Sequence, residues 1–266
     1  MKKKISQFFS ENFSDTSVSN FFSSVTKITF FSFRFLKQVF FPPYEFYETI
    51  RQSYHIGCKT FPLVAITAGI MGLVLTLQSR PVMVEFGAES WIPAMVGISI
   101  VREISPVITA LICAGKIGSG IGAELASMRI TEQIDAMEVS GINAFKYLVV
   151  TRVLGTIITI PILVIFADAI ALLGSFIGVN IKGDVSLQLF FSHVFHKLEF
   201  LDIIPATIKT FFFGGAIGIV SCYNGYFSDE GTEGVGRSAN SSVVISSLLI
   251  FIIDMVAVQL TNIFYP

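Results

Sequence analysis

The sequence predicts an all-α integral membrane protein with five transmembrane helices. Of the 266 residues, 53% are hydrophobic and only 14% are charged, and the mean hydropathy is +0.73. A water-soluble domain carries about 25% charged residues, so this chain has too little polar surface to be one. A helix that crosses a bilayer needs about 20 mainly apolar residues. Five stretches meet that requirement: residues 61–86, 91–121, 148–179, 203–227 and 243–263.

The N-terminal residues start like a signal peptide and then depart from that pattern. Lysines precede apolar residues in MKKKISQFF, but residues 10–19 are mostly polar and no continuous apolar core with a cleavage site follows. We therefore expect a cytoplasmic tail here. Residues 1–59 are expected to form this tail, an interfacial helix and a connector, and residues 60–266 to form one membrane domain.

Residues 20–43 are predicted to form an elbow helix that lies in the membrane interface. The segment is rich in phenylalanine, is interrupted by Lys27, Arg34 and Lys37, and ends at two prolines. Three cations are unfavourable in a spanning helix, whereas an interfacial helix can place them near the headgroups and its phenylalanines at the acyl boundary. A sixth, less hydrophobic span is the alternative. Residues 44–59 are predicted to form a polar connector helix.

The long second and third spans and the loop charges complete the predicted topology. Residues 91–121 and 148–179 exceed one bilayer thickness, so these helices must tilt, project or bend, with Pro106 and Pro161 as the expected kink points. Lys and Arg concentrate on the cytoplasmic side of membrane proteins. With the N-terminus cytoplasmic and the C-terminus periplasmic, the outside loops hold only Arg80, Lys182 and Lys197. The inside segments then hold Lys2, Lys3, Lys4, Lys27, Arg34, Lys37, Arg51, Lys59, Lys116, Arg129, Lys146, Arg152 and Arg237.

Five ionisable residues lie within the predicted spans: Arg102, Glu103, Asp168, Lys209 and Asp254. Each costs roughly 2.5–3.5 kcal/mol at the bilayer centre, so such groups usually pair or line a wet cavity. Arg102 and Glu103 are adjacent and point about 100° apart on a helix, so they cannot pair well with each other. Lys209 and Asp254 are candidate partners. The alternative is that these charges form ion pairs that only fix helix packing, and for Asp168 both interpretations stay open.

A short amphipathic segment, TEQIDAMEVSG, separates the second and third spans. Ile130, Ile134 and Met137 share one face of the predicted helix, and acidic residues occupy another. Just before it, Gly118 and Gly122 have the spacing that lets membrane helices approach closely. A rigid cytoplasmic helix between two long spans suits a subunit that receives force from a soluble motor. A solvated helical reversal is the alternative.

No catalytic or metal-binding pattern stands out. His193 and His196 are three residues apart with Glu199 nearby, but no further motif supports a metal site. CAGKIG lacks the spacing of a phosphate-binding loop, so we expect no ATP site and no cofactor in this chain. The three cysteines fit no disulfide or metal framework. The net charge of −1 gives no basic field for nucleic acid.

The segment REISPVITALICAGKIGSGIGAELASMRITEQIDAMEVSGINAF resembles the MlaE-type (YrbE) permeases. Two further stretches carry the same resemblance, TRVLGTIITIPIL and NGYFSDEGTEGVGRSANSSVVISSLLIFIID, and it extends from about residue 63 to the C-terminus. These permeases are the membrane subunits of ABC systems that work with MCE-domain proteins to move lipids. The resemblance therefore implies a transport subunit that depends on ATP hydrolysed in a partner chain.

The resemblance also implies an assembly and two sets of site residues. It implies a homodimer with an ABC ATPase on the cytoplasmic face, an MCE-protein ring on the periplasmic face, and a central cavity for a phospholipid or related lipid. The acidic segment corresponds to the coupling helix, expected over residues 124–140. The residues expected to contact the ATPase are Glu124, Arg129, Thr131, Glu132, Gln133, Asp135 and Glu138. The lipid cavity is expected to hold Arg102, Glu103, Lys209 and Asp254, with apolar walls from Leu73, Leu77 and Ile98.

Two other functions remain as alternatives, an intramembrane lipid-modifying enzyme and a membrane anchor for an ATPase. The absence of a transit peptide favours a bacterial inner membrane, where such systems are associated with lipid traffic to the outer membrane and its lipid asymmetry. Neither the lipid nor the direction of transport follows from the resemblance. Copurification of an ATPase subunit would separate the transporter and anchor from the enzyme.

Overall fold

The computed structural model describes residues 17–42, 44–181, 183–228 and 231–264. The chain divides into two units, Met1–Tyr44 and Glu45–Pro266. The described part of the first unit contains one helix, α2, Ser17–Val39. The segment predicted as an elbow, residues 20–43, is therefore helical as far as Val39. Its position in the membrane interface stays a prediction. The cytoplasmic tail and Lys182 lie outside the described residues.

The second unit begins with a helix that is longer than a single span. Helix α3 runs without a break from Phe46 to Glu85, so the polar connector and the first span form one helix. At 1.5 Å per residue its 40 residues cover roughly 60 Å, about twice the hydrocarbon thickness of a bilayer. The helix must therefore project beyond the membrane, and its polar N-terminal turns are the part suited to water.

The second apolar stretch is a continuous helical path with two widened turns. It consists of η1 (Glu89–Trp91), α4 (Ile92–Ser99), the π-helical segment η2 (Ile100–Ile104), α5 (Ser105–Cys113), the π-helical segment η3 (Ala114–Gly118) and α6 (Ser119–Ile130). The predicted irregularity near Pro106 is the η2 segment just before it, where the Ser105 N–H donates to the Ile100 carbonyl. Proline lacks an N–H for the carbonyl four residues earlier, which disfavours regular α-helix here. Such widened turns are frequent at functional sites.

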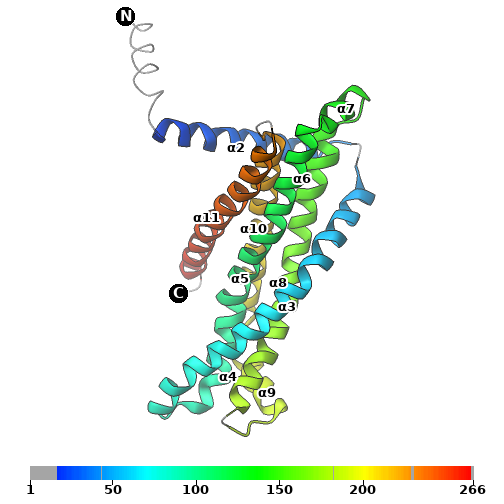
Figure 1. Ribbon diagram of the computed structural model, residues 1–266. Helices are drawn as coiled ribbons and strands as arrows, with labels where there is room; N and C mark the ends of the chain where they lie inside the picture. The colour runs from blue at the N-terminus through cyan, green and yellow to red at the C-terminus, as the bar shows by residue number, and fades with distance from the viewer. Residues whose placement is uncertain (1–16, 43, 182, 229–230, 265–266) are drawn as a thin grey trace, which may run out of the picture. The chain divides into compact units, whose positions relative to one another are not determined.

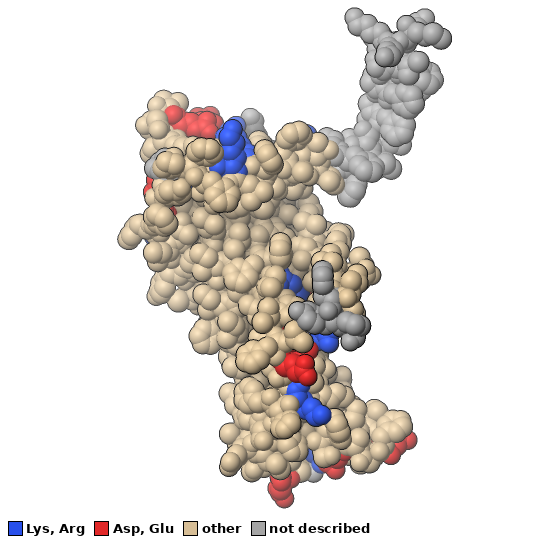
Figure 2. All heavy atoms as spheres, turned by 180° about the vertical axis from the view of Figure 1, so that it is seen from behind, with Lys and Arg blue, Asp and Glu red and all other residues tan. Residues whose placement is uncertain are grey.

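The chain then reverses direction at α7 and forms three more long helices, α8, α10 and α11. The remaining elements are α7 (Gln133–Val139), η4 (Phe145–Val150), α8 (Thr151–Asn180), α9 (Leu187–Lys197), α10 (Phe200–Tyr226) and α11 (Thr232–Phe264). In Figure 1, α7 lies at one end of the second unit and α9 at the other. Among the described residues five helical segments are long and apolar enough to span a membrane, which confirms the predicted fold class. The face shown in Figure 2 agrees with this fold class, because its charged side chains gather in a few places and the rest of the surface is uncharged.

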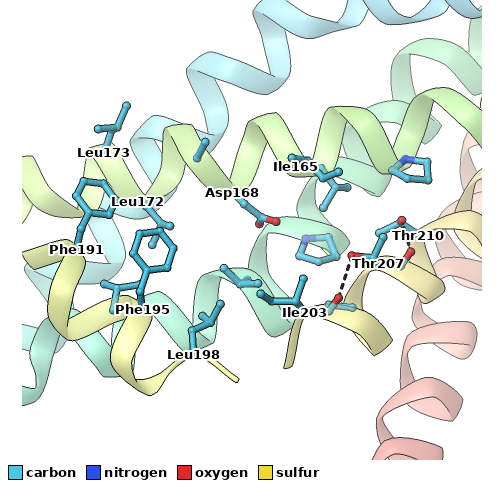
Figure 3. Close-up of a pocket in the computed structure, with 17 residues that line it drawn as sticks. Ile165, Asp168, Leu172, Leu173, Phe191, Phe195, Leu198, Ile203, Thr207 and Thr210 are labelled. Carbon is cyan, nitrogen blue, oxygen red and sulfur yellow. Dashed lines mark hydrogen bonds between the residues drawn. The ribbon is translucent and has the colours of Figure 1, made fainter. Parts of the chain in front are cut away.

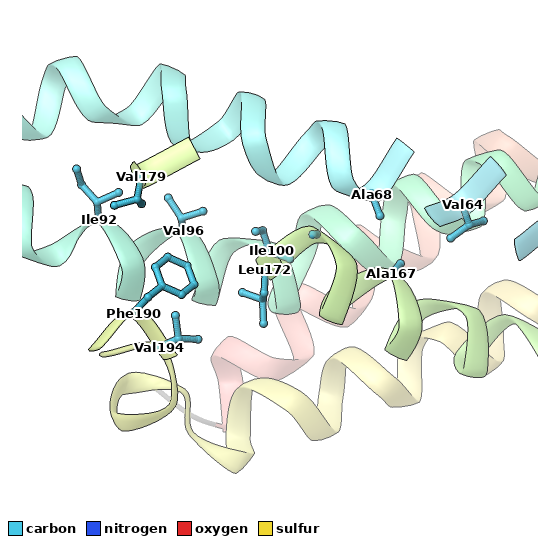
Figure 4. Packing of buried hydrophobic residues seen from close by; sticks show 11 residues of the cluster. Val64, Ala68, Ile92, Val96, Ile100, Ala167, Leu172, Val179, Phe190 and Val194 are labelled. Atoms are coloured by element: carbon cyan, nitrogen blue, oxygen red, sulfur yellow. The ribbon is translucent and has the colours of Figure 1, made fainter. Parts of the chain in front are cut away.

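The core packs α3, α4, α8 and α9 together. Figure 4 shows one cluster in which Val64 and Ala68 of α3 meet Ala167 of α8, while Ile92 and Phe190 pack near the α9 end. Close helix packing in membranes depends on small residues, because lipid offers no hydrophobic drive for helix association.

Small residues line several of these interfaces. A Cβ at Gly72 of α3 would lie 1.9 Å from the Ala171 carbonyl oxygen of α8, and the Thr76 and Ser175 hydroxyls bond across the same interface at 2.7 Å. The predicted close approach at Gly118 and Gly122 is also confirmed. A Cβ at Gly122 would lie 2.6 Å from the Ser242 Oγ of α11.

The contact at Gly72 leads to a stability prediction. Gly72→Ala should force α3 and α8 apart, and overpacking of this kind costs about 1–3 kcal/mol of unfolding free energy. The change would be measured as a lower thermal midpoint in detergent. The matched control is Gly120→Ala in α6, where an added Cβ would meet no neighbouring atom within 4 Å. Because alanine is the better helix former, the control should keep or raise the midpoint. Equal midpoints for the two variants would contradict the packing argument.

Candidate functional site

Three of the charges predicted to lie in the spans meet at Lys209. Its Nζ lies 2.7 Å from Glu103 Oε2 and 2.8 Å from Asp254 Oδ1, so η2, α10 and α11 are joined by one ammonium group. The lysine side chain is 4% exposed, whereas the Glu103 and Asp254 side chains are 37% and 19% exposed. Of the two candidate partners, Lys209 therefore pairs with Glu103, whereas Asp254 pairs with Lys209 and not with Arg102. The two carboxylates share one buried ammonium.

Arg102 has different partners from its neighbour. Its Nη1 lies 3.8 Å from Asp202 Oδ1, and its Nη2 donates to Asn262 Oδ1 at 3.3 Å. Both contacts are long, and the side chain is 39% exposed. A guanidinium has five N–H donors, so most of them can still bind a ligand. We refer to Arg102, Glu103, Lys209, Asp254 and Asp202 as the charged cluster.

Nothing in the sequence pattern pointed to Asp202 or Asn262 as partners of Arg102. Asp202 lies in the first turn of α10, where it forms a capping box with Glu199, and that capping pattern was the only local signal of a fixed carboxylate. Asn262 lies near the end of α11, 160 residues from Arg102. The pairing depends on how the ends of α10 and α11 sit beside η2, which no local pattern reports.

A larger apolar cavity adjoins the charged cluster. It has a volume of about 570 Å³ and lies between α10 and α11, with Lys209 as its one charged lining residue. The walls come from residues with exposed apolar side chains, including Ile208, Phe212 and Val256. Arg102, Glu103, Asp202 and Lys209 line a much smaller cavity on the other side of Pro205 and Ala257, which border both. The site thus combines fixed charges with an apolar groove.

The apolar walls predicted from other helices are not part of this groove. Leu73 and Leu77 belong to α3, which packs mainly on α8, and Ile98 belongs to α4. None of the three is among the residues that line the two cavities beside the charged cluster. In this chain the apolar surface next to Lys209 comes from α10 and α11 instead, because these are the helices that carry the cluster.

The acidic segment turns sharply at Glu132, between α6 and α7. We refer to residues 129–135 as the acidic corner. Glu132 has φ 57 and ψ 16, and it is the only non-glycine residue with positive φ in the described part of the chain. This left-handed conformation costs roughly 1–2 kcal/mol and reverses the chain sharply. Across the corner, Arg129 Nη1 donates to Asp135 Oδ1 at 2.6 Å, and Gln133 Nε2 donates to the Thr131 hydroxyl at 3.0 Å.

Helix α7 is anchored to the membrane helices on one face only. Ile134 is fully buried and Met137 is half-buried, as the predicted amphipathic face requires. The Tyr226 hydroxyl of α10 donates to Glu138 Oε1 at 3.0 Å. Glu132, Gln133 and Asp135 are exposed on the other side. A short rigid element with an exposed polar face is therefore attached to both α6 and α10.

Glu124 forms an ion pair within the chain, although its own side chain is 56% exposed, and its predicted contact with the ATPase stays a prediction. Arg152 of α8, with a side chain only 4% exposed, donates from Nη2 to Glu124 Oε1 at 2.9 Å and from Nη1 to the Leu148 carbonyl. The sequence indicated Arg152 only as a loop cation. The pair joins α6 to α8 about two helical turns before Glu132. It therefore fixes the end of α6 that leads into the acidic segment.

Other candidate groups are not assembled into a site. Within the described segments no group of three His, Cys, Asp or Glu side chains is placed to hold a metal ion. His193 Nδ1 lies 3.3 Å from the Ser90 carbonyl oxygen, which gives the imidazole a structural partner.

Comparison with known proteins agrees with this architecture. A sequence model described as Permease MlaE matches residues 49–260. A protein of Rickettsia felis named "Probable ABC transporter permease protein" is 40% identical over 240 residues, covering 90% of this chain and 93% of that protein. A Synechocystis protein with the same description is 32% identical over 205 residues, 77% of this chain and 78% of its own. "Protein TRIGALACTOSYLDIACYLGLYCEROL 1, chloroplastic" of Arabidopsis thaliana is 31% identical over 209 residues, 79% of this chain and 60% of its own.

The family match covers most of the chain, including η2, the acidic corner, three of the five spanning segments in full and all but three residues of each of the other two. The identity to the Rickettsia protein extends over nearly the whole length of both chains. Both findings agree with the predicted resemblance. The chain therefore belongs to the MlaE permease family and is a membrane-embedded, multi-pass transporter permease.

Proposed function

We propose that this permease is the membrane subunit of an ABC transporter that moves phospholipids or related lipids, driven by a separate ATPase subunit. The observation that carries the proposal is the charged cluster beside the 570 Å³ groove between α10 and α11. An amphipathic ligand with an anionic head and apolar chains has the chemistry of this site. The proposed site needs no cofactor in this chain, because ATP is bound by the partner.

Arg102 is the residue that we propose binds the lipid headgroup. Its partly exposed guanidinium has long contacts to Asp202 and Asn262, and a phosphate can accept two parallel hydrogen bonds from such a fork. Lys209 is held by Glu103 and Asp254, so it fixes the geometry and the local field. The acyl chains would lie along apolar residues such as Ile208 and Val256. In support, the Arabidopsis relative is named after trigalactosyldiacylglycerol, which is a lipid.

A second copy of the chain is the proposed cover of the groove. Helix α11 exposes Val244, Leu248 and Phe251 along with the residues of the groove wall. A second copy placed over this face would keep the partly exposed charges of Arg102 and Glu103 away from surrounding acyl chains, where charges are costly. The resemblance adds an MCE-protein ring on the periplasmic face. In this proposal the chain lies in a bacterial inner membrane, with the N-terminus cytoplasmic and the C-terminus periplasmic.

The acidic corner is the proposed docking element for the ATPase. Its exposed residues Glu132, Gln133 and Asp135 are presented by a helix that Tyr226 and Ile134 fix to the bundle. Force applied to α7 would pass to α6 through the Arg129–Asp135 pair and to α10 through Tyr226. In support, the Rickettsia relative's name is that of an ABC transporter permease, a class that works with an ATPase.

Charge reversal at the corner tests the proposal. Glu132→Lys should weaken copurification of the ATPase with the permease by at least about tenfold, because loss of one partner of a desolvated interfacial charge pair costs roughly 2–5 kcal/mol. Asp135 is less suitable for this test, since reversing its charge would also break its 2.6 Å pair with Arg129. The measurement is the ATPase recovered per permease after pull-down from solubilised membranes.

Glu45→Lys is the matched control, because Glu45 is an exposed carboxylate that precedes α3 in the same unit. It should leave ATPase recovery unchanged. Full recovery with Glu132→Lys would contradict the coupling role, and recovery of no ATPase even with the parent chain would contradict the whole proposal. Since ATP is cytoplasmic, docking at this corner would also place α7 on the cytoplasmic side.

A further inference from the structure

Asp168 lies in a second cavity that the proposed lipid path does not use. This cavity has a volume of about 450 Å³ and is enclosed by α8, α9, α10 and the η2–α5 segment. Figure 3 shows the Asp168 carboxyl pointing into a space bordered by Leu172, Phe195 and Ile203. The volume is within the range of roughly 300–1,000 Å³ typical of small-molecule sites. We refer to it as the Asp168 pocket.

The Asp168 carboxyl has no cationic partner among its described neighbours. It is the one charged side chain in the lining, and its Oδ1 is buried without a hydrogen-bond partner in the described residues. The Ser105 hydroxyl lies beside the carboxyl but carries no charge, and it is itself buried without a hydrogen-bond partner in the described residues. The lining hydroxyls of Thr207 and Thr210 donate to backbone carbonyls of α10. A carboxylate among apolar residues is unfavourable unless its charge is balanced. A bound cation with an N–H to donate would balance the charge and bond the unpartnered oxygen, whereas without such a cation the carboxyl would take up a proton instead.

Helix α10 separates this pocket from the groove beside Lys209. Ile203, Thr207 and Thr210 face the Asp168 pocket, whereas Ile204, Ile208 and Phe212 line the groove. Lys209 cannot neutralise Asp168, because its ammonium is held by Glu103 and Asp254 on the other face. The two sites therefore require separate occupants.

The shape and rim of the pocket indicate an aliphatic chain. Its lining runs along α8 from Pro161 to Leu173, roughly 18 Å at 1.5 Å per residue. The rim includes Ile165 and Phe195, which are 58% and 64% exposed. In a membrane-embedded chain such apolar rim residues open toward acyl chains rather than toward water. The pocket is thus a long apolar slot with one carboxylate inside it.

We propose that the Asp168 pocket binds an amphiphile with an aliphatic chain and an ammonium head, the ammonium paired with the Asp168 carboxylate. The chain would lie against Leu172, Phe191 and Ile203, and the head would supply the missing cation. This goes beyond the proposed lipid transport and does not depend on it, because the test scores binding at mapped residues rather than transport.

A photoreactive dodecylamine tests the proposal on the purified full-length protein. Adducts should map to α8, α9 and α10, and free dodecylamine should suppress them at about tenfold lower concentration than dodecanol, because a charge-assisted bond is stronger than a neutral one. Asp168→Asn should still be labelled but should lose this preference. Asp184→Asn, the same change at an exposed carboxylate that does not line the pocket, is the matched control and should keep it.

Two results would overturn the proposal. One is equal competition by dodecylamine and dodecanol in the parent protein, and the other is a preference for dodecylamine that persists in Asp168→Asn. If Asp168→Asn fails to fold, Ala169→Trp provides the second variant, because Ala169 is an exposed residue of the lining and a large ring there should occlude the slot. Adducts on α8 to α10 that persist in Ala169→Trp would likewise place the label outside the pocket.

Discussion

Lys209→Met should lower the free energy of unfolding by about 3–5 kcal/mol, the cost of leaving buried charges without their partner. Glu103 and Asp254 both bond the same ammonium, at 2.7 and 2.8 Å. Without it, two carboxylates would face each other at bilayer depth. The measurement is the thermal midpoint of the purified protein in detergent, together with the recovery of folded protein by size exclusion.

A triple variant separates the structural part of this role from transport. Glu103→Gln, Lys209→Met and Asp254→Asn together remove all three charges and keep similar side-chain volumes, so they should restore most of the stability. The restored protein should fold but not transport lipid, because the field around Arg102 has changed. A parent-like midpoint for Lys209→Met alone would show that the lysine does not hold η2, α10 and α11 together.

Arg102→Ala should abolish lipid transport and reduce copurified lipid by at least about tenfold, the value of one strong charge-assisted contact. The guanidinium is partly exposed and only loosely held by Asp202 and Asn262, so its removal should disturb packing little. The measurements are lipid per purified protein by mass spectrometry and transfer of lipid in reconstituted vesicles. Dimer formation and ATPase copurification should survive.

The matched control is an arginine with a structural role outside the charged cluster. Arg80 bonds Glu89 and the Val179 carbonyl, so Arg80→Ala should alter stability without changing copurified lipid. If Arg102→Ala retains full lipid while the dimer dissociates, the arginine serves helix packing and the headgroup assignment is wrong.

Much of the fold could be predicted from the sequence because membrane insertion is nearly a local property. The free energy of transferring a helix into lipid is close to a sum over its own residues, so five spans followed from hydropathy alone and are present. The buried face of α7 followed from helical periodicity in the same way, and Ile134 is fully buried as predicted. The small-residue spacing at Gly122 correctly indicated a close helix contact.

The boundaries of the helices were harder to predict from the sequence, because they depend on backbone geometry that composition does not determine. The polar connector and first span are one helix, α3, which continues through Gly57 and through Pro62 at their junction. The corner at Glu132 is a left-handed residue that a helical pattern cannot predict, since glutamate normally favours a right-handed helix.

The sequence by itself determined which helices are apolar enough to span a membrane and which charges lie within them, because both depend on residue type and order. Only the tertiary structure decided how those charges pair. Lys209 meets Glu103 from 106 positions away and Asp254 from 45, Arg102 meets Asn262 rather than its neighbour, and Glu124 meets Arg152. Asp168 lies in a pocket of its own and has no cationic partner among the residues that the structure describes. The physical reason is that each pairing depends on the rotation and crossing of whole helices, which are set by contacts such as Gly72 against Ala171 between residues far apart in the chain.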